Sequence, residues 1–155
     1  DAAREVIDMG FQVGLHTAGP YPRRLWDMIA SGLVDWVGLD IKALPEHYGQ
    51  VVGRANAAAK AWESLEVLIE AAGRGGPDFE VRTTVVPGDV TADDAVEVAR
   101  RVHAAGARVY ALQQARSEGT SGEFDVVAPG WDGMCERMAE RIEALGWDRF
   151  TYRPA

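Results

Sequence analysis

The sequence predicts an α/β protein, with a sheet of four to five parallel strands and helices on the outside. Three observations lead to this prediction. Apolar segments of strand length alternate along the chain with amphipathic segments of helix length. Glycine or proline lies at most of the junctions between them. Such an alternation is typical of parallel strands that are joined by right-handed crossovers.

The expected strands are short segments rich in valine, leucine and isoleucine, and most of them stop close to a glycine or a proline. The second strand has the clearest alternation of side chains, and the third stops at Pro87 and Gly88. Four or five strands are too few to close a barrel of eight. In chain order, the expected strands cover residues 12–17, 34–42, 79–86, 108–113 and a short last stretch, 150–152.

The expected helices have apolar residues at helical spacing. Pro22 is typical of a first helical turn, and Thr91 with Asp94 three residues later resembles an N-terminal capping box. Gly10 and Gly146 are expected to end the first and the last helix. The expected helices cover residues 2–9, 22–32, 57–72, 91–105 and 132–145, and the stretches 43–56 and 117–130 are expected to be loops.

Composition and charge exclude several classes of function. The 155 residues fit one domain, and the net charge of −8 argues against a general nucleic-acid binder. No apolar run approaches the roughly 20 residues that span a bilayer, so we expect no membrane partner. The single cysteine, Cys135, excludes an internal disulfide framework and favours a cytoplasmic protein. Neither a G-x-G-x-x-G motif nor a P-loop is present.

The strand over residues 34–42 ends in two opposite charges, Asp40 and Lys42. Their side chains point the same way, because side chains alternate along a strand. A parallel strand that ends in a charged pair is typical of α/β-barrel active sites. Lys42 is one of two lysines, against fourteen arginines, so this lysine is expected to have a specific task.

The same alternation predicts one apolar and one polar face of the sheet. The polar face carries His16, Asp40, Lys42, Arg82 and Gln113. An unpaired charge would cost several kcal/mol to bury, so these groups must pair with each other or with a ligand. This face suits a polar, anionic small molecule. A purely structural interpretation also stays open, in which Asp40 pairs with Lys42, Glu80 pairs with Arg82, and His16 is a core histidine.

Four segments in order resemble the radical S-adenosylmethionine (SAM) superfamily. The resemblance is strongest to its activating-protein branch, the activase of anaerobic ribonucleotide reductase, and weaker to the pyruvate formate-lyase activating enzyme. It implies a partial, TIM-like (β/α) barrel. The segments are Gly14–Pro22, Asp35–Ala43, Glu80–Pro87 and Tyr110–Gln114.

The resemblance also implies the cofactors and the partner. Members of this family are oxidoreductases that hold a [4Fe–4S] cluster on a C-x-x-x-C-x-x-C motif, cleave SAM reductively and abstract hydrogen from a glycine of a glycyl radical enzyme such as anaerobic ribonucleotide reductase. The chain contains no such cysteine motif. We therefore expect residues 1–155 to be the C-terminal portion of such a barrel, without the cluster-binding part, without a metal site or catalytic residues of its own, and inactive alone.

The matched positions imply which residues bind SAM. Asp40, Lys42 and Arg82 fall where relatives contact the methionine carboxylate and the ribose. Thr17 matches the threonine of a D-T-N-G turn, whereas His16 replaces its aspartate, which argues against a cation site there. The implied cofactor-binding residues are His16, Thr17, Asp40, Lys42, Arg82 and Gln113.

Two alternatives remain at this level. An α/β-barrel decarboxylase or aldolase could use Asp40 and Lys42, but Ala43-Leu44-Pro45 stands where the D-x-K-x-x-D motif needs its second aspartate. The chain could also be a non-catalytic docking half of a split protein, binding through the loop 117–130 and an exposed Trp131. An incomplete barrel leaves its first strand unpaired at one edge, which favours self-association.

Overall fold

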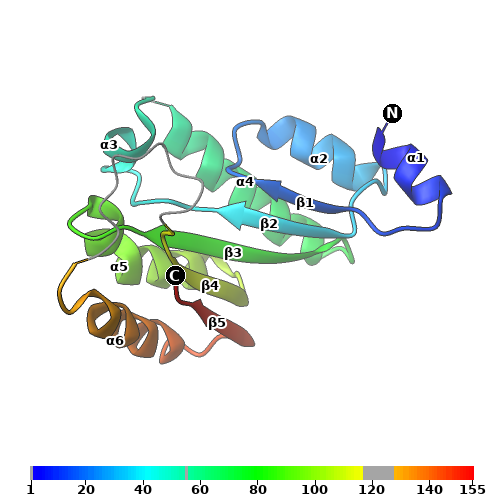
Figure 1. Ribbon diagram of the computed structural model, residues 1–155. Helices are drawn as coiled ribbons and strands as arrows, with labels where there is room; N and C mark the ends of the chain where they lie inside the picture. The colour runs from blue at the N-terminus through cyan, green and yellow to red at the C-terminus, as the bar shows by residue number, and fades with distance from the viewer. Residues whose placement is uncertain (1, 55, 117–127) are drawn as a thin grey trace.

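The computed structural model describes residues 2–54, 56–116 and 128–155 (Figure 1). Within these ranges the chain forms five strands and six helices in the expected alternation. The strands are β1 (Gly14–Thr17), β2 (Trp36–Asp40), β3 (Asp78–Val85), β4 (Val109–Gln114) and β5 (Arg149–Arg153). The helices are α1 (Ala2–Asp8), α2 (Pro22–Ala30), α3 (Tyr48–Val52), α4 (Ala57–Ala72), α5 (Val90–Ala105) and α6 (Trp131–Glu143).

The five strands form one parallel sheet in the order β1-β2-β3-β4-β5. Every crossover therefore steps in the same direction, and right-handed crossovers then place the connecting helices on one face. In Figure 1, α2, α4, α5 and α6 follow that side of the sheet. An α/β barrel has the same sequential strand order and the same placement of helices. The predicted α/β class is therefore confirmed, and the sheet is consistent with a partial barrel. In the described part of the chain, β1 and β5 are the two edges.

The core lies between this helical layer and the apolar face of the sheet. Val37 and Leu39 of β2 and Val81 of β3 have no exposed surface, as the alternation predicts. Leu65 of α4 and Val98 of α5 are equally buried and belong to the same cluster. Burying one such side chain stabilises the fold by about 1.5–3 kcal/mol. The apolar face of each strand therefore turns toward the helices, and the opposite face is left for polar groups.

Two local predictions are wrong. Residues 48–52 form the short helix α3 inside the expected loop, because a five-residue helix is too short to show an apolar period. The cap of α5 is Asp89, whose carboxylate accepts the amide of Thr91 at 2.8 Å, whereas the Thr91 hydroxyl accepts the amide of Val86 at 3.1 Å. Asp94 is therefore not part of a capping box and is available for another contact.

The two tryptophans near the ends of α6 pack against the rest of the protein, Trp131 buried and Trp147 half-buried. Trp131 is 6% exposed, so the exposed docking residue expected there is wrong. Trp147 stacks on Tyr110 with ring centroids 4.8 Å apart, and its indole nitrogen donates to the carbonyl of Ile142 at 2.9 Å. Cys135 is fully buried. Of the expected loop 117–130, residues 117–127 lie outside the described part of the chain.

Candidate functional site

The polar face of the sheet is organised around Arg82 of β3. Strand register places Arg82 beside Asp40 of β2, and His16 of β1 beside Gly38. The Arg82 guanidinium donates from Nε to Asp40 Oδ1 at 2.9 Å and lies 2.7 Å from the same oxygen through Nη2. Its Nη1 lies 2.5 Å from His16 Nδ1. Three adjacent parallel strands thus bring His16, Asp40 and Arg82 into one hydrogen-bonded group.

This geometry fixes the direction of the hydrogen bond between Arg82 and His16. A guanidinium only donates hydrogen bonds, so His16 Nδ1 accepts from Arg82 Nη1. Arg82 is only 12% exposed and Asp40 is 39% exposed, so the arginine forms the inner part of the group and the carboxylate the outer part.

Gly38 makes room for this arrangement. A Cβ at Gly38 would lie 2.7 Å from Trp36 Cη2 and 3.0 Å from Arg82 Cζ, so both side chains cross the strand above this residue. The Trp36 indole then packs edge-on against His16, with ring centroids 5.2 Å apart. Alternation along β2 puts Trp36 and Gly38 on the same face as Asp40, but no role for them was predicted. The sequence signal for this arrangement was Gly38 itself, which lies between Trp36 and Asp40 on the same face of β2 and leaves room for large side chains to cross the strand.

Lys42 lies next to this group without joining it. It follows the end of β2 and is half-buried, and no ion pair involving it occurs among residues 2–54, 56–116 and 128–155. Together with Asp40 and Thr84 it lines a cavity of about 260 Å³. Asp40 pairs with Arg82, so the pairing of Asp40 with Lys42 that the structural interpretation allowed is not formed.

Glu80 pairs with a different arginine from the one expected. Its side chain is 4% exposed, and its two oxygens lie 2.9 and 3.1 Å from Nη2 of Arg153. Arg153 belongs to β5, which is separated from β3 by β4. The predicted pairing of Glu80 with Arg82 is therefore wrong, because Asp40 on the neighbouring strand already holds Arg82.

Thr17 and Gln113 are placed apart from the Arg82 group. The Thr17 hydroxyl accepts the amide of Gly19 at 3.0 Å, and the Gly19 carbonyl accepts the Ser64 hydroxyl of α4 at 3.0 Å. These contacts hold the turn after β1 against α4. Gln113 lies half-buried at the end of β4 and lines a separate cavity of about 260 Å³ that Arg153 also lines.

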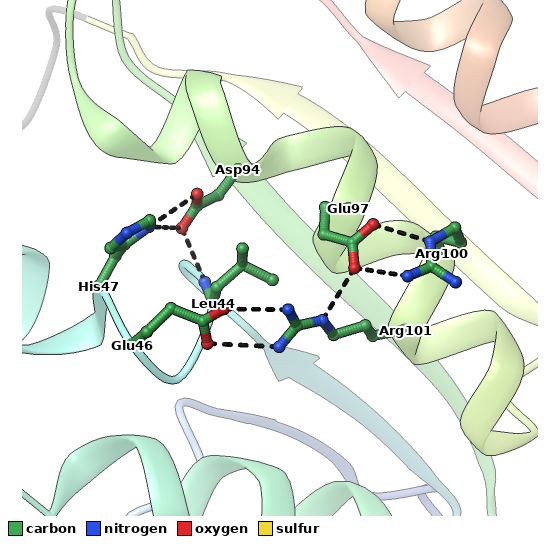
Figure 2. Close-up of polar contacts among 7 residues, drawn as sticks. All are labelled: Leu44, Glu46, His47, Asp94, Glu97, Arg100 and Arg101. Carbon is green, nitrogen blue, oxygen red and sulfur yellow. Dashed lines mark hydrogen bonds and ion pairs between the residues drawn. The ribbon is translucent and has the colours of Figure 1, made fainter.

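A polar network ties the segment after Lys42 to α5 (Figure 2). Asp94 is 4% exposed and accepts the backbone amide of Leu44 at 2.9 Å. His47 Nδ1 lies 2.9 Å from the same carboxylate. The segment that connects β2 to α3 is thereby fixed to α5, although these residues are about 50 positions apart in the chain. His47 lies in the stretch 43–56, for which only a loop was predicted, so this contact was missed.

Ion pairs continue the network along the surface of α5 (Figure 2). Arg101 binds Glu46 and Glu97, each at 2.9 Å, and Arg100 binds Glu97 at 2.6 Å. The hydrogen bonds from Arg100 and Arg101 lower the pKa of Glu97 to about 2. A carboxylate with a lowered pKa contributes stability above its ordinary range and loses it as the pH falls toward the lowered value. These exposed pairs therefore persist in mild acid.

Replacing Asp94 with alanine is expected to lower the free energy of unfolding by about 1–3 kcal/mol, because the Leu44 amide loses its acceptor inside the protein. Urea unfolding followed by circular dichroism measures this change. Asp93→Ala is the matched control, since Asp93 is exposed on the same helix, and it should change stability by no more than about 0.5 kcal/mol. Equal effects of the two substitutions would contradict an anchoring role for Asp94.

Comparison with known proteins gives a weak similarity. No family model matches the chain. Over 114 residues, 74% of its length, the chain is 26% identical to a protein of Methanocaldococcus jannaschii that is named "Putative glycyl-radical enzyme activating enzyme". The matched region is 47% of that protein, so the chain spans about half the length of this relative. The similarity indicates a relation to activating enzymes of this kind, and only weakly.

The described residues form neither a cluster suited to a metal ion nor a membrane-spanning helix. No group of three or more histidine, cysteine, aspartate or glutamate side chains suited to a metal ion occurs within residues 2–54, 56–116 and 128–155. Across the same residues, none of the helices is both long enough and apolar enough to cross a membrane.

Proposed function

We propose that this chain is the C-terminal portion of a radical SAM activating enzyme and contributes a wall of its SAM site. The observation that carries the proposal is the group formed by His16, Asp40 and Arg82 near the carboxyl ends of three adjacent parallel strands, with Lys42 beside it. That end of the strands is where α/β barrels bind their ligands. The weak similarity to a glycyl-radical enzyme activating enzyme supports this choice among α/β proteins.

The residues present fit the polar groups of SAM. Lys42 forms no ion pair with any described residue and can bind the methionine carboxylate. Asp40 is 39% exposed and keeps acceptor capacity for ribose hydroxyls or the amino group. The guanidinium of Arg82 already donates to Asp40 and His16, so we assign it the role of orienting these two side chains. Thr17 and Gln113 lie apart from the Arg82 group and remain secondary candidates for contacts with SAM.

In the full-length protein, a [4Fe–4S] cluster on another part of the barrel would complete the site. The reduced cluster would supply the electron that cleaves SAM, and the adenosyl part of SAM would then abstract the hydrogen atom. We propose a glycyl radical enzyme as the partner, with anaerobic ribonucleotide reductase as the specific candidate, and the cytoplasm as the compartment. The residues of this chain bind and orient the cofactor and take no part in cluster binding.

The proposal is tested on the full-length protein after anaerobic reconstitution with iron and sulfide. Reduction in the presence of SAM should release 5′-deoxyadenosine. Lys42→Ala is expected to weaken SAM binding about tenfold, because one charge-assisted contact to the carboxylate is lost. Isothermal titration calorimetry measures the affinity.

Arg74→Ala is the matched control for this substitution. Arg74→Ala also removes one positive charge, but Arg74 lies just after the C-terminal end of α4, where it pairs with Glu70. It should leave SAM affinity unchanged. Unchanged affinity of Lys42→Ala would remove Lys42 from the site. A full-length protein that binds its cluster but releases no 5′-deoxyadenosine would contradict the proposed function.

A further inference from the structure

A second cavity lies beside the proposed cofactor wall, between the turn after β1, helix α3 and the first turn of α4. Its volume is about 280 Å³. Figure 1 shows α3 and the start of α4 next to the carboxyl end of β2. Apolar atoms of Pro20, Val52 and Ala57 form part of its wall. The cavity is slightly smaller than most small-molecule sites, which measure about 300–1,000 Å³, so it suits a compact ligand.

The charge of this cavity is opposite to that of the chain. Lys42, Arg54 and Lys60 line it, and none of the described residues in its lining is acidic. The chain carries a net charge of −8, and these two lysines are its full complement of lysine. Within residues 2–54, 56–116 and 128–155, none of the three cations forms an ion pair. Three cations at one cavity, with no counter-charge from the described residues, favour an anionic ligand.

Tyr48 provides an independent observation at the same cavity. Its side chain is 2% exposed and lines the cavity, yet its hydroxyl is buried and has no hydrogen-bond acceptor among the described residues. Burial raises the pKa of this phenol, and the backbone amide of Lys42 offsets the rise in part. A buried donor without an acceptor costs about 1–3 kcal/mol. An anionic ligand in the cavity would accept a hydrogen bond from this hydroxyl.

Backbone amides in the first turn of α4 are further hydrogen-bond donors near this cavity. Asn56 is the N-cap residue of this 16-residue helix but makes no side-chain capping hydrogen bond. The amides at the start of a helix without a cap are open to an anion. Lys60, one turn into α4, lies 5.9 Å from the centre of the Tyr21 ring, which places its ammonium group over an aromatic wall.

We propose that this cavity binds a small organic anion, a phosphate monoester or a carboxylate with a compact apolar body. Lys60, Arg54 and the Tyr48 hydroxyl hold the charged group, and the apolar wall contacts the body of the ligand. These three residues are outside the proposed SAM wall, so the proposal does not rest on the proposed function. Lys42 lines both cavities and would place the anion next to the cofactor site.

Titration calorimetry at low ionic strength tests the site with phenyl phosphate, benzoate and the uncharged benzyl alcohol. One or both anions should bind and benzyl alcohol should not, and the stronger anion identifies the preferred charged group. Added salt should weaken binding, because partly exposed cations are screened. Equal binding of the alcohol, or no binding of either anion, would overturn the proposal, as would displacement of the anion by SAM.

Two variants assign the binding to this cavity. Lys60→Ala is expected to weaken anion binding about tenfold, whereas Arg74→Ala should leave it unchanged. Tyr48→Phe should also weaken binding while keeping the fold, since it removes only the buried hydroxyl, and circular dichroism checks the fold of each variant. If Lys60→Ala and Tyr48→Phe both bind as the parent does, the anion sits elsewhere and the assignment is wrong.

Discussion

Replacing Arg153 with methionine is expected to lower the free energy of unfolding by about 2–4 kcal/mol, because it leaves a buried carboxylate without its cation. Glu80 is 3% exposed, and both of its oxygens lie within 3.1 Å of Nη2 of Arg153. Methionine retains most of the apolar length of arginine, so the substitution removes mainly the charge. Urea unfolding followed by circular dichroism measures the change.

Two comparisons separate this effect from a general loss at the chain end. Arg149→Met changes the same residue type on the same strand, but Arg149 is exposed, so its effect should stay within about 0.5 kcal/mol. Glu80→Gln in the Arg153→Met background should recover part of the stability, because a neutral amide costs less to bury than a carboxylate. Equal losses for Arg149→Met and Arg153→Met would contradict the role of the ion pair.

The sheet could be predicted from the sequence because each strand has one apolar face. In β2 and β3 the alternation separates Leu39 and Val81, which have no exposed surface, from Asp40 and Arg82 on the other face. Helices can cover only one face when successive strands are added in one direction, so the alternation also fixes which side remains for polar groups. The strand order then follows from the regular succession of strands and helices.

The partners of the charged residues could not be predicted in the same way. Alternation gives the face on which Glu80 lies, but two arginines, Arg82 and Arg153, are within reach on that face. The choice depends on the register of β5 with β4, which a short strand of five residues does not reveal. The contact of Asp94 with Leu44 joins residues 50 positions apart through a loop that has no periodic pattern.

For the candidate site, too, the sequence predicts the face on which the residues lie but not their hydrogen-bond partners. The common face of His16, Asp40 and Arg82 follows from alternation, whereas their hydrogen bonds depend on strand register. Thr17 was selected by a matched motif, but its hydroxyl holds the turn at Gly19, a local contact that alternation does not describe. The cationic cavity was missed because its lysines come from different elements, a strand end and a helix, whose proximity no spacing rule expresses.

Replacing Gly38 with alanine is expected to disrupt the site more than any single charge removal. The new Cβ would lie 2.7 Å from Trp36 Cη2 and 3.0 Å from Arg82 Cζ, so the indole or the guanidinium must move. Overpacking of this kind costs about 1–3 kcal/mol, and displaced Arg82 no longer orients Asp40 and His16. We therefore expect lower stability in urea and, in the full-length protein, a larger loss of SAM affinity than Lys42→Ala causes.

Gly14→Ala provides a control on the same face of the sheet. Gly14 is in register with Trp36, but a Cβ there would lie 3.7 Å from the indole, an ordinary contact distance. This substitution should therefore leave stability and SAM affinity close to those of the parent. Trp36→Leu in the Gly38→Ala background should restore stability in part, because the smaller side chain relieves the overlap. If Gly38→Ala behaves as Gly14→Ala does, the close crossing of Trp36 and Arg82 over the strand is not required for the site.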